Sequence, residues 1–97
     1  MANYRVVLAP SVVETLRTIG SKEDARRVKN RLLSLSLAPH FGAVYDPIYD
    51  AARPDHEVLV TYAGHYGIYY VFDDAEKLVN VEYLEDTMRD PMSRFSG

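Results

Sequence analysis

The segment 56–84 constrains the fold of this chain most, because it contains three short runs of β-branched and aromatic residues. The runs cover residues 56–62, 66–72 and 78–84, and such side chains suit the pleated, half-buried surface of a strand. The first gap is short and contains Gly64, which can adopt the positive φ of a tight turn. Strands joined by such short connections pair antiparallel, so the segment predicts a three-stranded β-meander.

Alternation along the runs predicts which side chains share a face of the sheet. The middle run places Tyr66, Ile68, Tyr70 and Phe72 on one face, and Gly67, Tyr69 and Val71 on the other. Two apolar faces are typical of a central strand that is covered by helices on one side and by a loop or a partner on the other. In the last run Val79, Val81 and Tyr83 alternate with Asn80 and Glu82, which predicts one polar face there.

The first half of the chain predicts a strand followed by two helices. Residues 3–8 form the strand, and Pro10 suits the first turn of a helix that ends near Gly20. Ser21, with Asp24 three residues later, resembles a capping box. The second helix then has an apolar stripe of Ala25, Val28, Leu32 and Leu35 and reaches its limit at Pro39. We expect the apolar connection 40–55 to pack on the sheet.

The fold class that follows is α+β, with the element order β-α-α-β-β-β. A helical hairpin packs on one face of a four-stranded, mainly antiparallel sheet, and residues 1–97 form one domain. With 97 residues and 47% hydrophobic composition, the chain has enough apolar residues for a single core. It lacks an apolar run of membrane-spanning length, and it has no cysteine, which fits a cytoplasmic protein.

The distribution of charge bears on possible partners. The net charge is −3, which argues against strong direct DNA binding, but residues 1–53 hold eight Lys and Arg against five Asp and Glu. Five of the cations lie on the second helix: Lys22, Arg26, Arg27, Lys29 and Arg31. A solvated face is the simpler interpretation of this patch, and a surface for an acidic partner is the alternative.

Two leucines and a tyrosine also favour a surface for a partner. Leu33 and Leu37 lie off the buried stripe of the second helix, so they are expected to be exposed unless a partner covers them. Tyr69 lies on the second face of the sheet, and tyrosine is a favoured interface residue. Together with Arg26 and Lys29, these three residues form the predicted partner-binding set.

Histidines provide the candidate acid–base groups. His56, His65 and Tyr66 lie at the ends of predicted strands, with Arg53 just upstream, so the four could converge as a catalytic set. The competing interpretation is that hairpin ends simply favour polar residues. His40 is expected to be a loop residue, and the scattered histidines predict no metal site and no cofactor.

The element order and two segments resemble the RelE/ParE superfamily of toxins from bacterial type II toxin–antitoxin modules. The segments are Tyr4-Arg-Val-Val-Leu-Ala-Pro-Ser and Ala63-Gly64-His65-Tyr66-Gly67-Ile68-Tyr69-Tyr70-Val71-Phe72-Asp73-Asp74, which is similar to the family's hairpin pattern G-x-Y-R-I-x-Y-x-x-D-D. The resemblance implies a growth-inhibiting toxin that is neutralised by a cognate antitoxin protein, with the ribosome or DNA gyrase as target.

Two departures from the family pattern bear on the chemistry. The ribosome-dependent mRNases have an arginine after the hairpin tyrosine, where this chain has Gly67, and basic residues after the last strand, where it has Glu85 and Asp86. Cleavage of RNA needs cationic stabilisation of the phosphorane, whereas an acidic pair repels the substrate. The resemblance therefore favours a ParE-like toxin that acts by binding. The alternatives are an mRNA endonuclease and a non-toxic member that only binds its partner.

Overall fold

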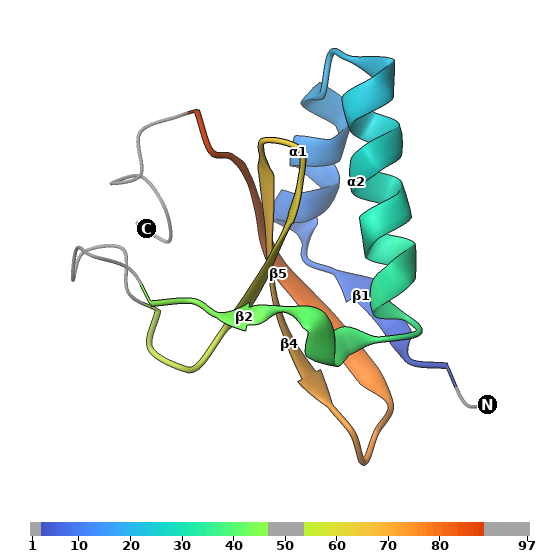
Figure 1. The fold of residues 1–97 in the computed structure, drawn as a ribbon, viewed down its shortest axis with the longest axis vertical. Coiled ribbons are helices and arrows are strands. Elements are labelled where there is room, and N and C mark those ends of the chain that lie inside the picture. The colour runs from blue at the N-terminus through green and yellow to red at the C-terminus, as the bar shows by residue number, and fades with distance from the viewer. Residues whose placement is uncertain (1–2, 47–53, 89–97) are drawn as a thin grey trace.

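A computed structural model describes residues 3–46 and 54–88 of the chain (Figure 1). The elements are β1 (Arg5–Leu8), α1 (Pro10–Thr18), α2 (Lys22–Leu35), the 3-10 turn η1 (Pro39–Phe41), β2 (Ala43–Val44), β3 (Leu59–Ala63), β4 (Tyr66–Asp73) and β5 (Leu78–Asp86). The strands form one sheet in the order β1-β5-β4-β3-β2. Both helices lie on one face of this sheet, where α1 packs against β5 and α2 packs against β3 and β1 (Figure 1).

The sheet is mainly antiparallel, as predicted, but its described part has five strands rather than four. The additional strand is β2, which belongs to the connection that was expected to pack on the sheet. Ala43 pairs with Val60 and Val44 pairs with Leu59, and the backbone N–H of Tyr45 continues the ladder to Val58. Where this connection lies along the edge of the sheet, its backbone N–H and C=O groups need hydrogen-bond partners. The backbone of β3 supplies these partners, so the connection forms a strand there.

The two edges of the sheet differ in origin. β1 is hydrogen-bonded to β5 in a parallel pairing that matches Arg5 with Leu78 and Leu8 with Val81. Parallel neighbours require a crossover connection, and here the crossover contains both helices and the strands β2, β3 and β4. β2 forms the opposite edge next to β3. The three strands of the meander are therefore flanked by one short strand on each side.

Local sequence signals explain how the helices begin and how the hairpin turns. Pro10 starts α1, and the Ser21 hydroxyl accepts a hydrogen bond of 3.2 Å from the backbone N–H of Asp24 at the start of α2. That bond satisfies one of the donors that every helix N-terminus leaves open. In the β3–β4 turn Gly64 has a φ of 62°, as the turn requires. These predicted features are confirmed.

Side chains are buried on both faces of the sheet, and the core on the helical face is the larger of the two. The main core lies between the helices and the sheet and consists of Tyr4, Val12, Val28, Leu32, Leu35, Ala63, Tyr66, Ile68, Tyr70, Val79, Val81 and Leu84. The second core lies on the opposite face and consists of Val58, Val60 and Tyr69, with Tyr45, Val71 and Tyr83 packed against them. β4 contributes alternate residues to both cores, which confirms its prediction as a central strand with two apolar faces.

The predicted alternation along β5 is wrong at its second half. A β-bulge interrupts the β4–β5 ladder, so that Tyr69 pairs with Tyr83 whereas Tyr70 pairs with Val81. The residue between them, Glu82, is the extra residue, and it reverses the faces that follow. Val79 and Val81 therefore lie in the main core while Tyr83 lies in the second core. The bulge also brings Leu84 to the main core and Glu85 to the second face.

Neither helix in the described part of the chain is long and apolar enough to cross a membrane.

Candidate functional site

The exposed face of α2 carries cations in its first half and leucines in its second half. Lys22, Arg26, Lys29, Leu33 and Leu37 follow each other at intervals of three or four residues, so they lie on one side of the helix and its C-terminal extension. Leu33 is 67% exposed and Leu37 is 69% exposed, as the sequence predicts. Within residues 3–46 and 54–88, no carboxylate forms an ion pair with the three cations, so their charge is presented to solvent.

An apolar groove runs beside this face, between α2 and the edge strand β1. Its lining residues are Val6, Leu8, Leu16, Lys29, Leu32, Leu33 and Ser36, and its volume is about 550 Å³. Leu16 comes from α1, so three elements form the groove. Because β1 is an edge strand, the backbone groups on its outer side are also open to pairing with a further strand. We call this site the β1–α2 groove.

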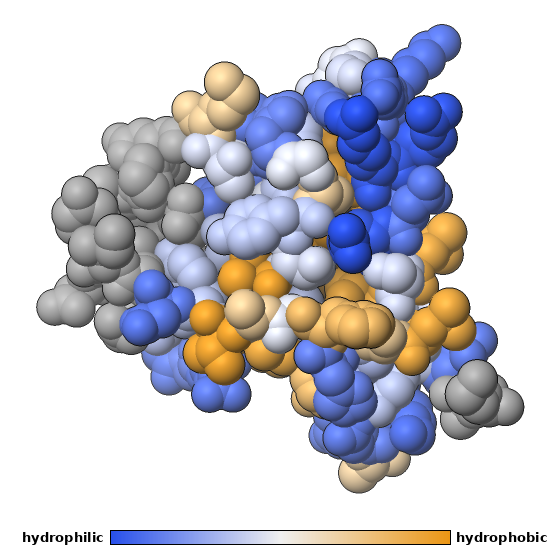
Figure 2. Space-filling view, viewed as in Figure 1, coloured by the Kyte–Doolittle hydropathy of each residue, from blue (hydrophilic) through white to orange (hydrophobic). Residues whose placement is uncertain are grey.

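Exposed apolar side chains continue beyond α2 onto the turn η1 and the strand β2. Phe41 is 83% exposed and Val44 is 56% exposed. Figure 2 shows hydrophobic side chains along the lower part of α2 and across η1 and β2, below the strongly hydrophilic upper part of α2. The sequence predicted the leucines but missed Phe41 and Val44 as surface residues. Their apolar character within the connection 40–55 indicated packing on the sheet, and only the structure shows that these two side chains face outward.

His65 lies in the turn between β3 and β4 and contacts two carboxylates from other elements. Its Nδ1 lies 2.8 Å from Asp86 Oδ1 at the end of β5, and its Nε2 lies 3.2 Å from Asp24 Oδ2 in the first turn of α2. Hydrogen bonds to Asp86 and then to Asp24 raise the pKa of His65 above its ordinary value of 6.5. The Tyr66 ring lies 4.5 Å from the imidazole between centroids.

His56 lies beyond the opposite end of β3, so the predicted convergence of His56 with His65 is wrong. The five residues of β3 separate them, which is roughly 17 Å at about 3.3 Å per residue. His56 Nε2 lies 2.7 Å from Glu82 Oε1, and its Nδ1 contacts Asp55. Bonds to Asp55 and then to Glu82 raise the pKa of His56. The fourth member of the predicted set, Arg53, lies outside the described residues.

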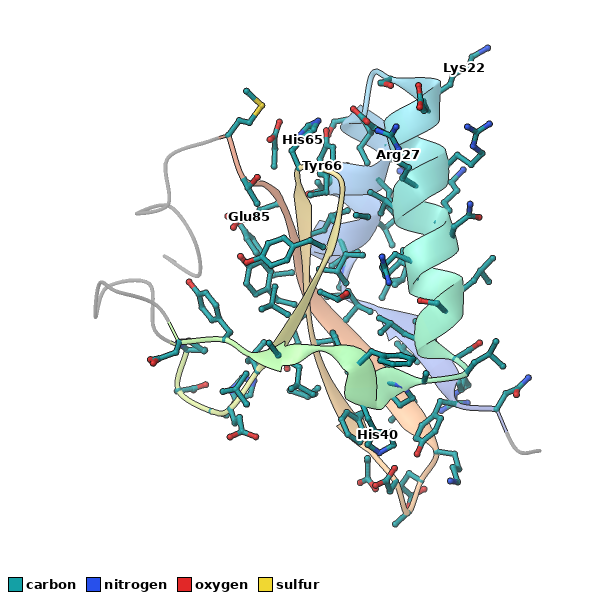
Figure 3. The ribbon with its side chains drawn as sticks, viewed as in Figure 1. Lys22, Arg27, His40, His65, Tyr66 and Glu85 are labelled. Atoms are coloured by element: carbon teal, nitrogen blue, oxygen red, sulfur yellow. The ribbon has the colours of Figure 1, made fainter. Side chains whose placement is uncertain are left out.

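The third histidine, His40, lies at the other end of the sheet from His65. Figure 3 shows His40 near the β4–β5 turn, whereas His65 and Tyr66 lie at the opposite end of the sheet close to Arg27. The His40 ring packs edge-on against Phe72, with 4.6 Å between centroids. Its Nε2 lies 3.4 Å from a carboxylate oxygen of Asp74. His40 is therefore a residue of a short turn that packs on the sheet.

Tyr69 is fully buried in the second core, which corrects its expected exposure on the second face of the sheet. Its hydroxyl donates a hydrogen bond of 2.6 Å to Glu85, whose own exposure is 6%. The Tyr45 ring covers it from the side of β2, with 4.9 Å between ring centroids. The position is buried because the connection that contains β2 folds over this face.

Gly67 lies between Tyr62 on β3 and Glu85 on β5, at the position where the hairpin pattern described above has an arginine. A Cβ atom built on Gly67 would lie 3.1 Å and 3.2 Å from two atoms of the Tyr69 side chain and 3.4 Å from Tyr62. These distances are tighter than ordinary van der Waals contact. The space around Gly67 is filled by the Tyr69 ring, and the nearest ladder neighbour on β5 is acidic.

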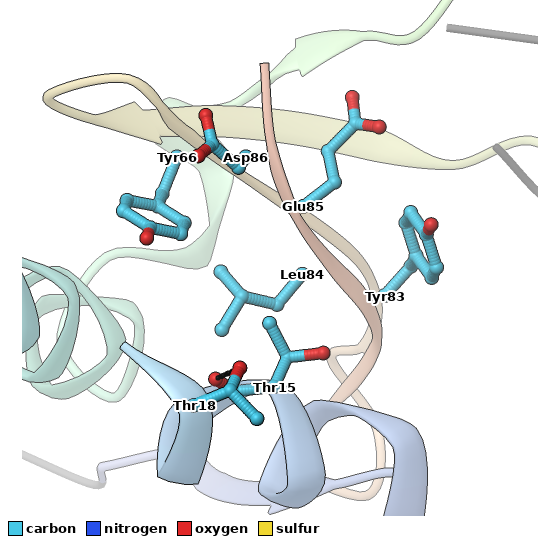
Figure 4. A pocket seen from close by; sticks show the side chains of 7 residues that line it. All are labelled: Thr15, Thr18, Tyr66, Tyr83, Leu84, Glu85 and Asp86. Atoms are coloured by element: carbon cyan, nitrogen blue, oxygen red, sulfur yellow. Dashed lines mark hydrogen bonds between the residues drawn. The ribbon is translucent and has the colours of Figure 1, made fainter. Parts of the chain in front are cut away.

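An acidic pocket of about 400 Å³ lies between α1 and the end of β5 (Figure 4). Its lining residues are Thr15, Thr18, Tyr66, Tyr83, Leu84, Glu85 and Asp86. Glu85 and Asp86 are adjacent on β5, and Figure 4 shows the Tyr66 ring below the Asp86 carboxylate. The Glu85 carboxylate is bonded to the buried Tyr69 hydroxyl, and no Lys or Arg is among the lining residues, so the pocket offers no cation of its own to a phosphate group.

Metal binding is a further possibility for clustered histidines and carboxylates. Among the described residues, no group of three or more His, Cys, Asp or Glu has an arrangement that could hold a metal ion. The two histidine sites each consist of one imidazole between two carboxylates, and their short contacts are hydrogen bonds.

Comparison with known proteins shows the fold. No family model matches the sequence, and no curated protein matches it either. The structure resembles a chain in the crystal structure of the archaeal RelE–RelB complex from Pyrococcus horikoshii, with a TM-score of 0.67 and 22% sequence identity. The similarity covers 93% of this chain and 100% of that chain. The predicted RelE/ParE-like fold is thereby confirmed over nearly the whole length.

Proposed function

We propose that this chain is the toxin of a type II toxin–antitoxin module of the RelE/ParE superfamily, that it inhibits growth by binding a target protein, and that a cognate antitoxin neutralises it. The fold supports the first part of the proposal, since the similar chain belongs to a RelE–RelB complex. The observation that carries it is the exposed face of α2. Two leucines on that face are each about two-thirds exposed, and an apolar groove runs alongside them.

The chemistry of this face defines the antitoxin segment that would cover it. Apolar side chains of the segment would fill the β1–α2 groove and bury Leu33 and Leu37. Acidic residues would lie along Arg26 and Lys29 in the preceding turns of α2. Opposite charges would speed the encounter and set the register, while apolar burial would hold the complex. The free edge of β1 allows part of the segment to pair as a strand.

Co-expression with the small protein encoded beside this gene tests the proposal. We expect the two proteins to elute together in size-exclusion chromatography, with an association rate that falls as salt rises and a complex that survives high salt. We also expect growth arrest when this chain is expressed alone, and recovery when the neighbour is present. Separate elution at every ionic strength together with normal growth would contradict the proposal.

Matched variants locate the binding face. Leu33→Asp places a charge on the α2 face and is expected to weaken the complex by at least roughly tenfold, because it would bury an unpaired carboxylate next to the groove. Met88→Asp is the control, since Met88 is 80% exposed and follows β5 rather than α2. Equal loss of binding in both variants, or in neither, would mean that the antitoxin docks elsewhere.

Action by binding rather than by RNA cleavage is supported by the surroundings of Gly67. Stabilising a phosphorane requires a cation at the reacting phosphate. The structure has Glu85 and the Tyr69 ring around Gly67, and Glu85 and Asp86 in the adjacent pocket. His65, the remaining acid–base candidate, has a carboxylate at each ring nitrogen. The ladder neighbours of Gly67 supply no cation, and both ring nitrogens of His65 are already engaged, so these residues lack the groups that RNA cleavage requires.

Purified components distinguish the two mechanisms. We expect intact mRNA after incubation of this chain with translating ribosomes, and we expect inhibition of supercoiling if DNA gyrase is the target, as the resemblance to ParE-type toxins implies. An mRNA cleavage pattern that disappears in His65→Ala would instead establish the endonuclease. Antitoxin binding without growth arrest would indicate a member that only binds its partner.

A further inference from the structure

The β3–β4 turn is held to two other elements through one imidazole ring. His65 Nδ1 reaches Asp86 on β5 at 2.8 Å, and Nε2 reaches Asp24 on α2 at 3.2 Å. α2 lies on the helical face of the sheet and β5 lies within it, so the ring joins the two layers of the fold at this end. The side chains of His65, Asp24 and Asp86 are 36%, 21% and 29% exposed, so the contacts are partly shielded from water.

The protonation state of the ring decides whether both contacts hold. A neutral imidazole has one N–H donor and one acceptor nitrogen, whereas the imidazolium has two donors. Ionised carboxylates only accept hydrogen bonds. Neutral His65 can therefore donate a hydrogen bond to Asp24 or to Asp86 but not to both. The lone pair of its second nitrogen would then face the lone pairs of the other carboxylate, which is a repulsive contact. Only the imidazolium satisfies the observed geometry.

The other charged groups around the ring reinforce this dependence. On α2, the Arg27 guanidinium lies 3.4 Å from Asp24 and 2.6 Å from Glu23, so Asp24 retains a cationic partner when His65 is neutral. On β5, the adjacent Glu85 points to the other face of the sheet, where it binds Tyr69, so Asp86 is the acid that faces the ring. On β4, the Tyr66 ring contacts the imidazole. Among the described residues around the ring, the acidic groups outnumber the one cation.

The backbone of the turn is tied to the end of β5 as well. The carbonyl oxygen of His65 accepts two hydrogen bonds from Thr87, one from the backbone N–H and one from the hydroxyl, each of 2.7 Å. Movement of the turn away from Asp86 would strain both bonds. These bonds keep the turn on β5 when the contact to Asp24 opens, so the Thr87 amide serves as an internal reference.

We propose that His65 is a pH-dependent clamp: as an imidazolium it fastens the β3–β4 turn to both α2 and the end of β5, and on deprotonation it releases one of them. Asp24 is released first, because its contact is the longer one and Arg27 competes for it. Opening therefore frees the start of α2 from the turn, whereas Asp86 keeps the turn on β5. The proposal is independent of the identity of the toxin's target.

NMR of the imidazole nitrogens in the intact protein tests the clamp directly. We expect both nitrogens to be protonated at pH 6 and the ring to titrate above 6.5. Asp86→Asn and Asp24→Asn are each expected to lower the pKa of His65. We also expect the nuclear Overhauser effects between the His65 ring and the Asp24 side chain to weaken at least roughly twofold above the pKa, because that contact opens, whereas those to Asp86 persist.

Glu23→Gln is the matched control, because it removes a carboxylate from the same turn of α2 without removing a contact to His65. It should lower the pKa of His65 less than Asp24→Asn does. Should a variant fail to fold, titration of the native protein alone decides the matter, through the nuclear Overhauser effects between the His65 ring and Asp24. A His65 ring that titrates at or below 6.5, or ring contacts to Asp24 that persist above the pKa, would overturn the proposal.

Discussion

One buried hydroxyl group, that of Tyr70, holds the turn η1 in place between α2 and the sheet. The Tyr70 side chain is fully buried, yet its hydroxyl has two backbone partners around η1. It donates to the Pro39 carbonyl at 2.6 Å and accepts from the Gly42 N–H at 2.9 Å. Burial raises the pKa of Tyr70, so the hydroxyl stays protonated and keeps its donor role. A Cβ at Gly42 would overlap this hydroxyl, which explains glycine at that position.

Tyr70→Phe should lower the free energy of unfolding by about 1–3 kcal/mol, because it leaves the buried Pro39 carbonyl and the partly buried Gly42 N–H without their partner. Chemical denaturation followed by circular dichroism measures the change. Tyr62→Phe is the control, since the Tyr62 side chain is 51% exposed and should change stability by less than about 0.5 kcal/mol. Equal effects in the two variants would show that the Tyr70 hydroxyl is not the anchor of η1.

The His56 contact predicts a pH dependence of its own. Hydrogen bonds to Asp55 and Glu82 raise the folded-state pKa of His56, so the stabilisation is fully present below the unfolded value near 6.5 and is lost as pH rises through the folded value. Glu82→Gln should lower the pKa of His56 and reduce the loss of stability between pH 6 and pH 9. NMR titration of His56 in both proteins checks this. An unchanged pKa would mean that Glu82 does not contact the ring in solution.

At the scale of elements, α2 illustrates how one helix serves the core and the surface. Val28, Leu32 and Leu35 face the sheet and are buried, whereas Leu33 projects to solvent. The two faces follow from the 3.6-residue period of the helix, and the burial of one face stabilises it more than its helix propensity does. The exposed leucines contribute little to the stability of the fold, so we expect them to act in binding a partner.

Leu32→Ala should lower the free energy of unfolding by about 2–5 kcal/mol through lost burial and a cavity, because Leu32 is only 7% exposed. Leu33→Ala changes the same residue type one position later on the same helix, and it should cost less than about 0.5 kcal/mol. Denaturation midpoints of the two variants provide the comparison. A larger loss of stability in Leu33→Ala than in Leu32→Ala would show that Leu33, and not Leu32, faces the sheet.

At the scale of the whole molecule, the two cores share one strand. β4 contributes Ile68 and Tyr70 to the main core and Tyr69 to the second core, and all three side chains are fully buried. Neither core can lose its packing while β4 stays in place, because alternate residues of one strand hold both faces. The helices, the sheet and the connection over the second face therefore form one cooperative unit.

Equilibrium unfolding should consequently be a single transition. The chain has eight tyrosines and no tryptophan, so tyrosine fluorescence reports on the packing of both cores, and far-ultraviolet circular dichroism reports mainly on the helices. We expect coincident midpoints from the two signals, as for a two-state domain of this size. Separate midpoints would reveal that the second core unfolds on its own.

The sequence by itself determined the elements and most of their faces. Apolar periodicity placed both helices and all three strands of the meander, Ser21 marked the start of α2, and Gly64 marked the tight turn. It also indicated that Leu33 and Leu37 are exposed. These features depend on residues a few positions apart, for which local propensity and periodicity suffice.

Only the tertiary structure decided how distant segments combine. The bulge at Glu82 moves Tyr83 to the second core, the connection forms β2 and covers Tyr69, and β3 keeps His56 and His65 apart. Each depends on pairing between residues far apart in the chain. The register of such pairs is selected by the packing of the whole sheet, and a one-residue shift exchanges its faces. For that reason the candidate surface on α2 could be predicted, whereas the clamp at His65 could not.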